Sequence, residues 1–160
     1  MFKMLAALAI VAGLWGTAPA IAAEIDFSKA LVIGSGPKMV IEFTDPDCPF
    51  CRKASKYFDA RNDVTRYVYF HPLPMHPKAM EKARYILSQH DPAKAYHEVM
   101  SGSLDGKKSL GATPRGIKLL EEQMEIVKNN KVSSTPTFMI YGRVIEGFDL
   151  RRIEEALGPK

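Results

Sequence analysis

Two cysteines, the only ones in the chain, are separated by two residues in the segment Cys48-Pro49-Phe50-Cys51. The segment follows a short apolar run and opens a stretch with helical spacing, which predicts both sulfurs at a helix N-terminus, one turn apart. A helix N-terminus carries partial positive charge and unpaired N–H groups, which favour a thiolate over a thiol. We therefore expect Cys48 to be the exposed, attacking thiolate and Cys51 to be the buried thiol that resolves a mixed disulfide.

Three other interpretations of this chemistry stand beside thiol–disulfide exchange. A structural disulfide across so short a loop would stabilise the fold weakly. A zinc knuckle normally needs four ligands, and the chain has no second cysteine pair. A copper-binding exported protein could use the two cysteines together with His71, Met75, His76 and Met80, whose imidazole and thioether groups suit copper. For this His/Met loop we favour packing on the helix beneath it.

The cysteine pair lies within a recognisable order of elements. Four segments have the apolar or alternating pattern of strands, and they cover residues 39–43, 64–70, 137–141 and 143–147. Helices are expected over residues 48–60, as three consecutive helices within about 78–130, and over 149–157. The order is strand, helix, strand, then a helical insertion, then strand, strand, helix. It predicts an α/β domain with a central mixed sheet, built as βαβ followed by ββα.

Residues 1–23 have the pattern of a cleavable signal peptide. Lys3 forms a short positive region, Met4 to Trp15 is apolar and uncharged, and small residues lead to Ala23. Glycines and a proline interrupt the apolar stretch, which argues against a transmembrane anchor. We expect residues 24–160 to form a single exported domain, in an oxidising compartment where a cysteine pair can persist as a disulfide.

The composition excludes several classes of protein. Hydrophobic residues make up 46% and charged residues 25% of the 160 residues, which is typical of a globular domain. The net charge of +4 is small and dispersed along the chain, so we expect no nucleic-acid partner.

Two segments resemble one family. Phe43 to Cys51 (FTDPDCPFC) resembles the active-site segment of the bacterial periplasmic disulfide isomerases of the DsbC/DsbG type. Val132 to Phe138 (VSSTPTF) resembles the segment that carries a cis-proline after a threonine in that family, and Gly142 to Gly147 is similar to its following hairpin. The resemblance covers about residues 39–157 and implies a thioredoxin fold.

The resemblance also implies an activity and its partners. The activity would be dithiol–disulfide exchange in the periplasm with cysteine-containing exported proteins, without a diffusible cofactor or a metal. A membrane thiol reductant of the DsbD type would be the electron-transfer partner. At Thr135-Pro136, a cis bond would turn the Thr135 backbone outward beside Cys48, where its N–H and C=O could pair with an extended substrate. We assign Thr135, Pro136, Pro49 and Phe50 to substrate binding.

Glu42 is a third candidate catalytic residue. It lies inside an apolar strand, where an ionised carboxylate is costly, and it could take and return the proton of Cys51 during exchange. The alternative is an acid on the outer face of an edge strand. Thioredoxins and DsbA-type oxidases have an acid at the matching place, whereas the isomerase does not.

The chain differs from these isomerases in one further respect. Those proteins dimerise through a separate N-terminal domain, and few residues lie between position 23 and the first predicted strand of this chain. We therefore expect a monomer with reductase or oxidase activity and weak isomerase activity. An apolar face on the helices of 78–130 is the place where a dimer could form instead.

Overall fold

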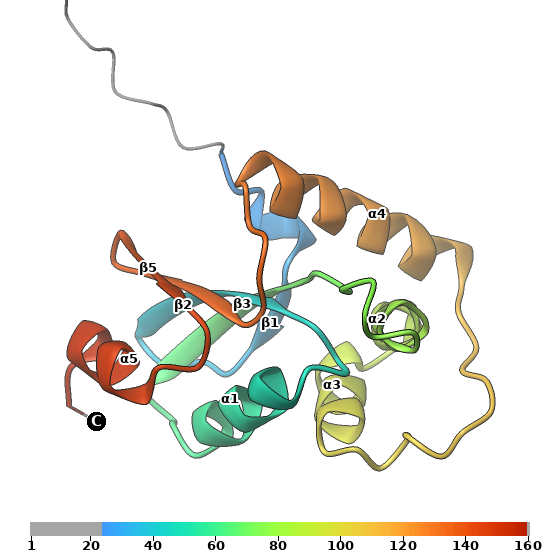
Figure 1. Cartoon of the computed structure of the whole chain (residues 1–160), viewed down its shortest axis with the longest axis horizontal. Helices are drawn as coiled ribbons and strands as arrows, with labels where there is room; N and C mark the ends of the chain where they lie inside the picture. The colour runs from blue at the N-terminus through green and yellow to red at the C-terminus, as the bar shows by residue number, and fades with distance from the viewer. Residues whose placement is uncertain (1–23, 160) are drawn as a thin grey trace, which may run out of the picture.

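The computed structural model describes residues 24–159, which form a five-stranded mixed sheet with helices on both faces (Figure 1). The strands are β1 (Leu31–Ile33), β2 (Lys38–Thr44), β3 (Val64–Phe70), β4 (Thr137–Ile140) and β5 (Arg143–Glu146). The helices are the short 3-10 helix η1 (Phe27–Lys29) and α1 (Pro49–Asp59), α2 (Ala79–Ser88), α3 (Pro92–Met100), α4 (Pro114–Asn129) and α5 (Leu150–Leu157). The predicted signal peptide lies outside the described residues.

The strand order is β1-β3-β2-β4-β5. β2 and β3 are parallel and are joined through α1, as the predicted βαβ unit requires. β4 runs antiparallel to β2, and β5 runs antiparallel to β4, with a tight turn at Tyr141 and Gly142 between them. This topology confirms the predicted central mixed sheet, built as βαβ and then ββα.

One strand was not predicted. β1 pairs antiparallel with β3, with Leu31 opposite Val68 and Ile33 opposite Arg66. Its three residues are too few to show an alternating pattern, and the strand is specified by the edge of β3 that it covers. The first strand expected from the sequence began only at residue 39.

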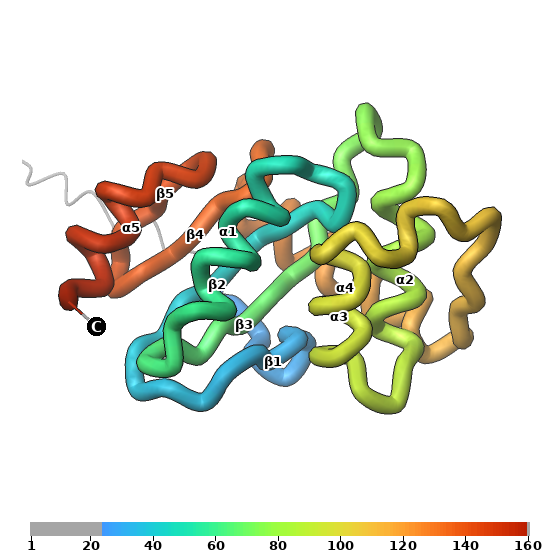
Figure 2. Tube along the Cα trace, turned by 90° about the horizontal axis from the view of Figure 1, so that it is seen from below, coloured from blue at the N-terminus to red at the C-terminus, as the bar shows by residue number. Residues whose placement is uncertain are grey.

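The two faces of the sheet bury different helices. Val40 of β2 and Phe138 of β4 pack with α1 and α5 on one face. Phe43 of β2 and Tyr69 of β3 pack with Val127 of α4 on the other face. Figure 2 shows α1 and α5 in front of the sheet and α4 behind it. Because successive residues of a strand alternate between faces, Glu42 shares the α1 face with Val40.

Three helices, α2, α3 and α4, lie between β3 and β4, where the sequence predicts the helical insertion. Their apolar residues join those of β1 and β3 in one core cluster that also contains both cysteines. Tyr96 of α3 and Ile86 of α2 are fully buried in this cluster. The insertion thus supplies part of the wall around the cysteine pair.

None of the helices described within residues 24–159 is long and apolar enough to cross a membrane.

The loops that carry the candidate site residues meet at one end of the sheet. The C-terminal ends of the parallel strands β2 and β3 lie at the same end, together with the N-terminal end of the antiparallel strand β4. The segment that leads into α1, the loop after β3 and the segment before β4 therefore meet there. These segments contain Cys48, His76 and Pro136, respectively.

Candidate active site

The cysteine pair opens helix α1. Cys48 is the N-cap residue, Pro49 is in the first turn, and Cys51 lies one turn into the helix. Proline fits this position because its missing N–H would have no partner inside the helix. Both cysteines are free thiols. The prediction that the pair lies at a helix N-terminus is confirmed.

The exposure of Cys48 differs from the prediction. Only 4% of Cys48 is exposed, and Cys51 is completely buried. The prediction of an exposed Cys48 is wrong in this respect, because segments distant in the sequence contact it: the Thr135 carbonyl and the core cluster that includes the helical insertion. The relative order still holds, since Cys48 is the more accessible of the two.

The surroundings separate the acidities of the two thiols. A hydrogen bond with the Cys51 side chain lowers the pKa of Cys48 to about 5, against the desolvation that raises it. The backbone N–H groups of Cys51 and Phe50 contribute in the same direction, as expected at a helix N-terminus. Burial raises the pKa of Cys51, and the hydrogen bond with Cys48 raises it further. Cys48 is therefore the thiolate of the pair at neutral pH.

The segment before β4 closes the site from the opposite side. The Thr135-Pro136 peptide bond is cis, as the resemblance implied. The Cys48 sulfur lies 3.5 Å from the carbonyl oxygen of Thr135. The carbonyl of Pro136 accepts a hydrogen bond from Gly147 at 2.7 Å, which ties this segment to the end of β5. Thr135 and Pro136 thus lie directly beside Cys48.

The two residues between the cysteines face the solvent. Pro49 and Phe50 are both exposed, and Phe50 is 57% exposed. The ammonium of Lys53 lies 5.4 Å from the centre of the Phe50 ring. An exposed aromatic ring next to a reactive sulfur offers apolar contact area to a bound chain.

Glu42 is fully buried on the α1 face, but it is not surrounded only by apolar groups. Arg66 of β3 donates from Nη1 to Glu42 Oε2 at 3.1 Å, and it also donates to Asp59 at 2.9 Å. The hydroxyl of Tyr96, from α3, lies 3.5 Å from Glu42 Oε1. The alternative of an outward-facing acid is thereby excluded, and Glu42 has a cation partner that its own strand did not reveal.

Sequence reasoning missed the role of Asp45. Its carboxylate is fully buried and accepts hydrogen bonds from the backbone N–H groups of Asp47, Cys48 and Leu73, and it contacts the ring of His76. The signal available in the sequence was the Asp-Pro-Asp segment, because an Asp that starts a turn bonds its own backbone two residues on.

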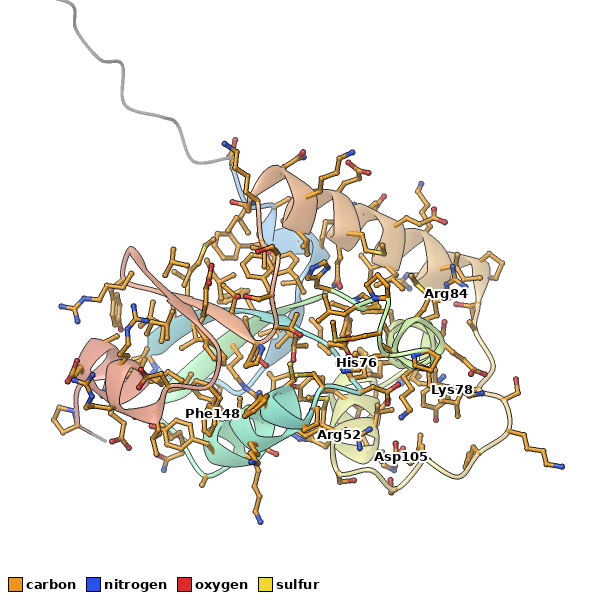
Figure 3. The ribbon with its side chains drawn as sticks, viewed as in Figure 1. Arg52, His76, Lys78, Arg84, Asp105 and Phe148 are labelled. Atoms are coloured by element: carbon orange, nitrogen blue, oxygen red, sulfur yellow. The ribbon has the colours of Figure 1, made fainter. Side chains whose placement is uncertain are left out.

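Four charged side chains form a second network beside the cysteines. Arg52 of α1 and Lys82 of α2 both contact Asp47 and Asp105. Figure 3 shows Arg52 and Asp105 next to each other, where the loop after α3 reaches α1. The guanidinium of Arg52 is shared between these two carboxylates. The network fastens the insertion to the segment that leads into Cys48.

The copper alternative is not supported. Nδ1 of His76 is occupied by Asp45 at 2.9 Å, and Met75 is 74% exposed and points away from the core. Burial lowers the pKa of His71. Within residues 24–159 no three side chains of His, Cys, Asp or Glu are grouped so that they could hold a metal ion.

Comparisons with known proteins agree with this geometry. A Bordetella avium (strain 197N) protein named "Probable thiol:disulfide interchange protein DsbC" is 30% identical over 113 residues, which are 71% of this chain and 39% of that protein. The "Thiol:disulfide interchange protein DsbG" of Pseudomonas aeruginosa is 28% identical over 106 residues, which are 62% of this chain and 41% of that protein. The chain thus spans about two fifths of these relatives.

One solved structure is covered by this chain over its whole length, unlike the two relatives above. The "disulfide interchange protein from Neisseria gonorrhoeae" matches with a TM-score of 0.69 and 28% identity, covering 84% of this chain and all of that one. Residues 27–149 match the model of the family described as "Thioredoxin-like domain". With its mixed sheet, its CxxC helix and its cis-proline, the chain belongs to this thioredoxin-like family.

Proposed function

We propose that this chain is a thiol:disulfide oxidoreductase that exchanges disulfides with cysteine-containing proteins through Cys48 and Cys51. The observation that carries the proposal is the split between two neighbouring thiols. One is held as a thiolate at a helix N-terminus, with a pKa of about 5, and the other is kept protonated by burial. Exchange needs both: an ionised sulfur to attack, and a protonated one that is activated only later.

The proposed reduction of a substrate disulfide proceeds in two steps. The Cys48 thiolate attacks one substrate sulfur, the substrate S–S bond breaks, and the other substrate sulfur leaves as a thiolate. Cys51 then loses its proton and attacks the Cys48 sulfur, so the mixed disulfide breaks and a Cys48–Cys51 disulfide forms. The substrate has gained two electrons and the protein has lost two. The reverse sequence oxidises a substrate dithiol.

Glu42 is the proposed group that accepts the proton of Cys51 and returns it. Its carboxylate lies on the same face of the sheet as α1, and Tyr96 packs in one core cluster with Cys51 while its hydroxyl reaches Glu42. Tyr96 interacts electrostatically with Cys51, and its hydroxyl belongs to the buried polar cluster of Glu42, Tyr96 and Arg66. A carboxylate in such a place can accept a proton when the buried thiol ionises.

The proposed substrate site lies around Cys48. The carbonyl and N–H of Thr135 offer an edge to an extended chain, and Pro136 fixes the direction of that edge. Pro49 and Phe50 supply exposed apolar surface on the other side of the sulfur. Hydrogen bonds to the substrate backbone and apolar contacts do not depend strongly on the substrate's side chains. Such a site would accept many sequences around a substrate cysteine.

The proposed partners follow from the same chemistry. The substrates are exported proteins that contain cysteines, and the signal-peptide pattern of residues 1–23 supports a periplasmic location. A chain that works in the reduced state needs a source of electrons across the membrane, for which a thiol reductant of the DsbD type is the proposed donor. We further propose that the domain is a monomer.

Insulin tests the proposed function. The reduced protein, in catalytic amount with dithiothreitol, should accelerate the precipitation that follows reduction of the insulin chains. Cys48→Ser should abolish the acceleration. Reduced Cys51→Ser, freed of dithiothreitol and mixed with insulin, should instead accumulate a covalent complex through Cys48, visible by mass spectrometry and released by reductant. A wild-type protein that does not accelerate the reaction, or a Cys51→Ser protein that traps nothing, would contradict the proposal.

A further inference from the structure

The chain makes a tight turn immediately before Cys48. Asp45-Pro46-Asp47-Cys48 closes with a hydrogen bond of 3.1 Å from the Cys48 N–H to the Asp45 carbonyl. Oδ1 of Asp45 also accepts from the N–H of Asp47 at 2.7 Å and from that of Cys48 at 3.2 Å. An aspartate in the first position and a proline in the second are the residues that favour this kind of turn. The Asp45 side chain thus fixes the backbone that carries Cys48.

The other oxygen of the same carboxylate holds a different loop. Oδ2 of Asp45 accepts from the N–H of Leu73 at 2.7 Å and lies 2.9 Å from Nδ1 of His76. Leu73 and His76 are themselves joined by a turn, with a backbone hydrogen bond of 2.9 Å. One buried carboxylate therefore joins the segment that enters α1 to the loop that leaves β3. Figure 3 shows His76 beside α2, at the end of the sheet where this loop runs.

The backbone of Asp45 reaches the second cysteine as well. Its N–H lies 3.4 Å from the sulfur of Cys51. The residue consequently contacts the peptide group of Cys48 and the sulfur of Cys51, while its side chain touches neither sulfur. The stabilisation of the Cys48 thiolate depends on hydrogen bonds from Cys51 and Phe50, so it requires that the Cys48 sulfur stay over the end of α1.

We propose that Asp45 is a positioning residue for the exchange reaction: its carboxylate, held from the other side by Leu73 and His76, keeps the Cys48 sulfur over the N-terminus of α1. This inference rests on the proposed function, since it concerns the same thiolate. Three of the four contacts of this fully buried carboxyl group are 2.7 to 2.9 Å long, and short hydrogen bonds of this kind fix geometry firmly.

The negative charge of Asp45 and its positioning role predict opposite changes in the pKa of Cys48. A negative charge near Cys48 opposes formation of the thiolate, so its removal alone would lower the pKa of Cys48. If Asp45 acts through geometry, its removal loosens the turn and raises that pKa. The other charged or titratable side chains around this turn are unchanged in the variants below, and they are His71, Asp47, Arg52, Lys82 and Asp105.

Asp45→Asn is the main variant. The amide retains one acceptor oxygen for the turn, but its NH2 group confronts the N–H of Leu73, so the link to the neighbouring loop is lost. His76→Ala removes a different member of the same link and leaves the Asp45 charge in place, whereas His76→Gln retains a donor. Asp63→Asn is the matched control, because Asp63 accepts from Arg61 at the opposite end of β3.

The measurement is the ultraviolet absorbance of the thiolate in the reduced proteins, titrated with pH, together with circular dichroism to verify folding. Asp45→Asn should raise the pKa of Cys48 by about one pH unit, His76→Ala should raise it less, and His76→Gln and Asp63→Asn should match the wild type. A lower or unchanged value in folded Asp45→Asn overturns the proposal. If that variant does not fold, an unchanged value in His76→Ala overturns it.

The failure of this proposal and the failure of the proposed function can be told apart. A wild-type protein that fails to reduce insulin would contradict the oxidoreductase assignment, yet the titration of Cys48 would still report what Asp45 does. Conversely, the wild type could reduce insulin while neither Asp45→Asn nor His76→Ala raises the pKa of Cys48. That result would support the oxidoreductase assignment and contradict only the positioning role of Asp45.

Discussion

Arg66 reaches from β3 to Glu42 on β2, with Nη1 lying 3.1 Å from Oε2, and the two side chains are 2% and 0% exposed. In the parallel register Arg66 lies opposite Val40, so the two charged residues are diagonal neighbours on the α1 face. A guanidinium cannot lose its proton in a protein, so Glu42 always meets a positive charge there. A buried pair of this kind is costly to break on one side only.

The first prediction concerns the stability of this pair. Arg66→Met should lower the free energy of unfolding by about 3–5 kcal/mol, because Glu42 is left buried without its cation. Adding Glu42→Gln to Arg66→Met should recover a large part of the loss, since the unpaired charge is then gone. Urea denaturation of the two single variants and the double variant measures the coupling. Additive losses would show that the pair is not coupled.

The second prediction concerns the role of Glu42 in exchange. Glu42→Gln keeps the shape and an acceptor oxygen for Arg66, but it removes the proton acceptor, so mixed disulfides through Cys48 should persist longer at pH 6 to 8, by about tenfold or more. Asp59→Asn is the matched control, because Asp59 also pairs with Arg66 but its side chain is 39% exposed. Rapid acid quenching and mass spectrometry follow the mixed disulfide. Equal lifetimes in the two variants would make Glu42 a structural acid.

The sequence predicts the chemistry of this site better than its surroundings. The cysteine pair, its helix and the cis-proline are specified by local residues: Pro49 fits the start of a helix, and the Val132–Phe138 segment carries its own resemblance. The partner of Glu42 comes from 24 positions further along, and the carbonyl that covers Cys48 from 87 positions further along. Local patterns cannot show such contacts, because the topology of the sheet creates them.

The same reason explains the two other differences. β1 has three residues, and only the edge of β3 makes them a strand. The local sequence assigned no role to Asp45, whereas the fold buries it and gives it a backbone donor from Leu73, 28 positions away. In both cases the physical property that matters is decided by a segment that is distant in sequence.

The third prediction concerns pH. The pKa of Cys48 is about 5 in the folded protein, and the ordinary value is 9.0. Alkylation of reduced protein by iodoacetamide should therefore follow a titration near pH 5, and Cys51, kept protonated by burial, should react far more slowly. Alkylation of both cysteines at the same rate would contradict this expectation. A pKa of Cys48 near the ordinary value would contradict it as well.

The same pKa has a consequence for stability. Between pH 5 and 9 the folded chain binds fewer protons at Cys48 than the unfolded chain does, so the stability of the reduced protein rises with pH over this range. The gain is lost as the pH falls through about 5. Relative to Cys48→Ser, the reduced wild type should gain stability from pH 5 to pH 8 in urea denaturation. A constant difference between the two proteins would contradict the prediction.

The fourth prediction concerns substrate contact. Phe50→Ala removes an exposed ring beside Cys48 without opening the core, so the KM for a disulfide-containing protein should rise severalfold while the stability stays within about 0.5 kcal/mol. Val144→Ala is the matched control: Val144 is similarly exposed, but it lies on the edge strand β5. Exchange with a small aliphatic disulfide, which cannot reach the ring, should be unaffected. A similar rise of the KM in both variants would show a nonspecific effect.

The last prediction concerns assembly. A stable obligate dimer needs an apolar interface of about 2,000 Å² or more, and the helical insertion is the place where the sequence allows such a surface. Within residues 78–130, every large hydrophobic side chain is buried or half-buried, and the exposed ones elsewhere are dispersed over η1, α1, α5, the strands and the loops. We therefore expect the domain of residues 24–160 to be a monomer at micromolar concentration, with clear reductase activity and weak repair of scrambled substrates, because a monomer has no cleft in which to hold a misfolded chain. Light scattering coupled to size exclusion measures the mass, and refolding of scrambled ribonuclease measures the isomerase activity. A stable dimer that also refolds the scrambled substrate efficiently would overturn both expectations together.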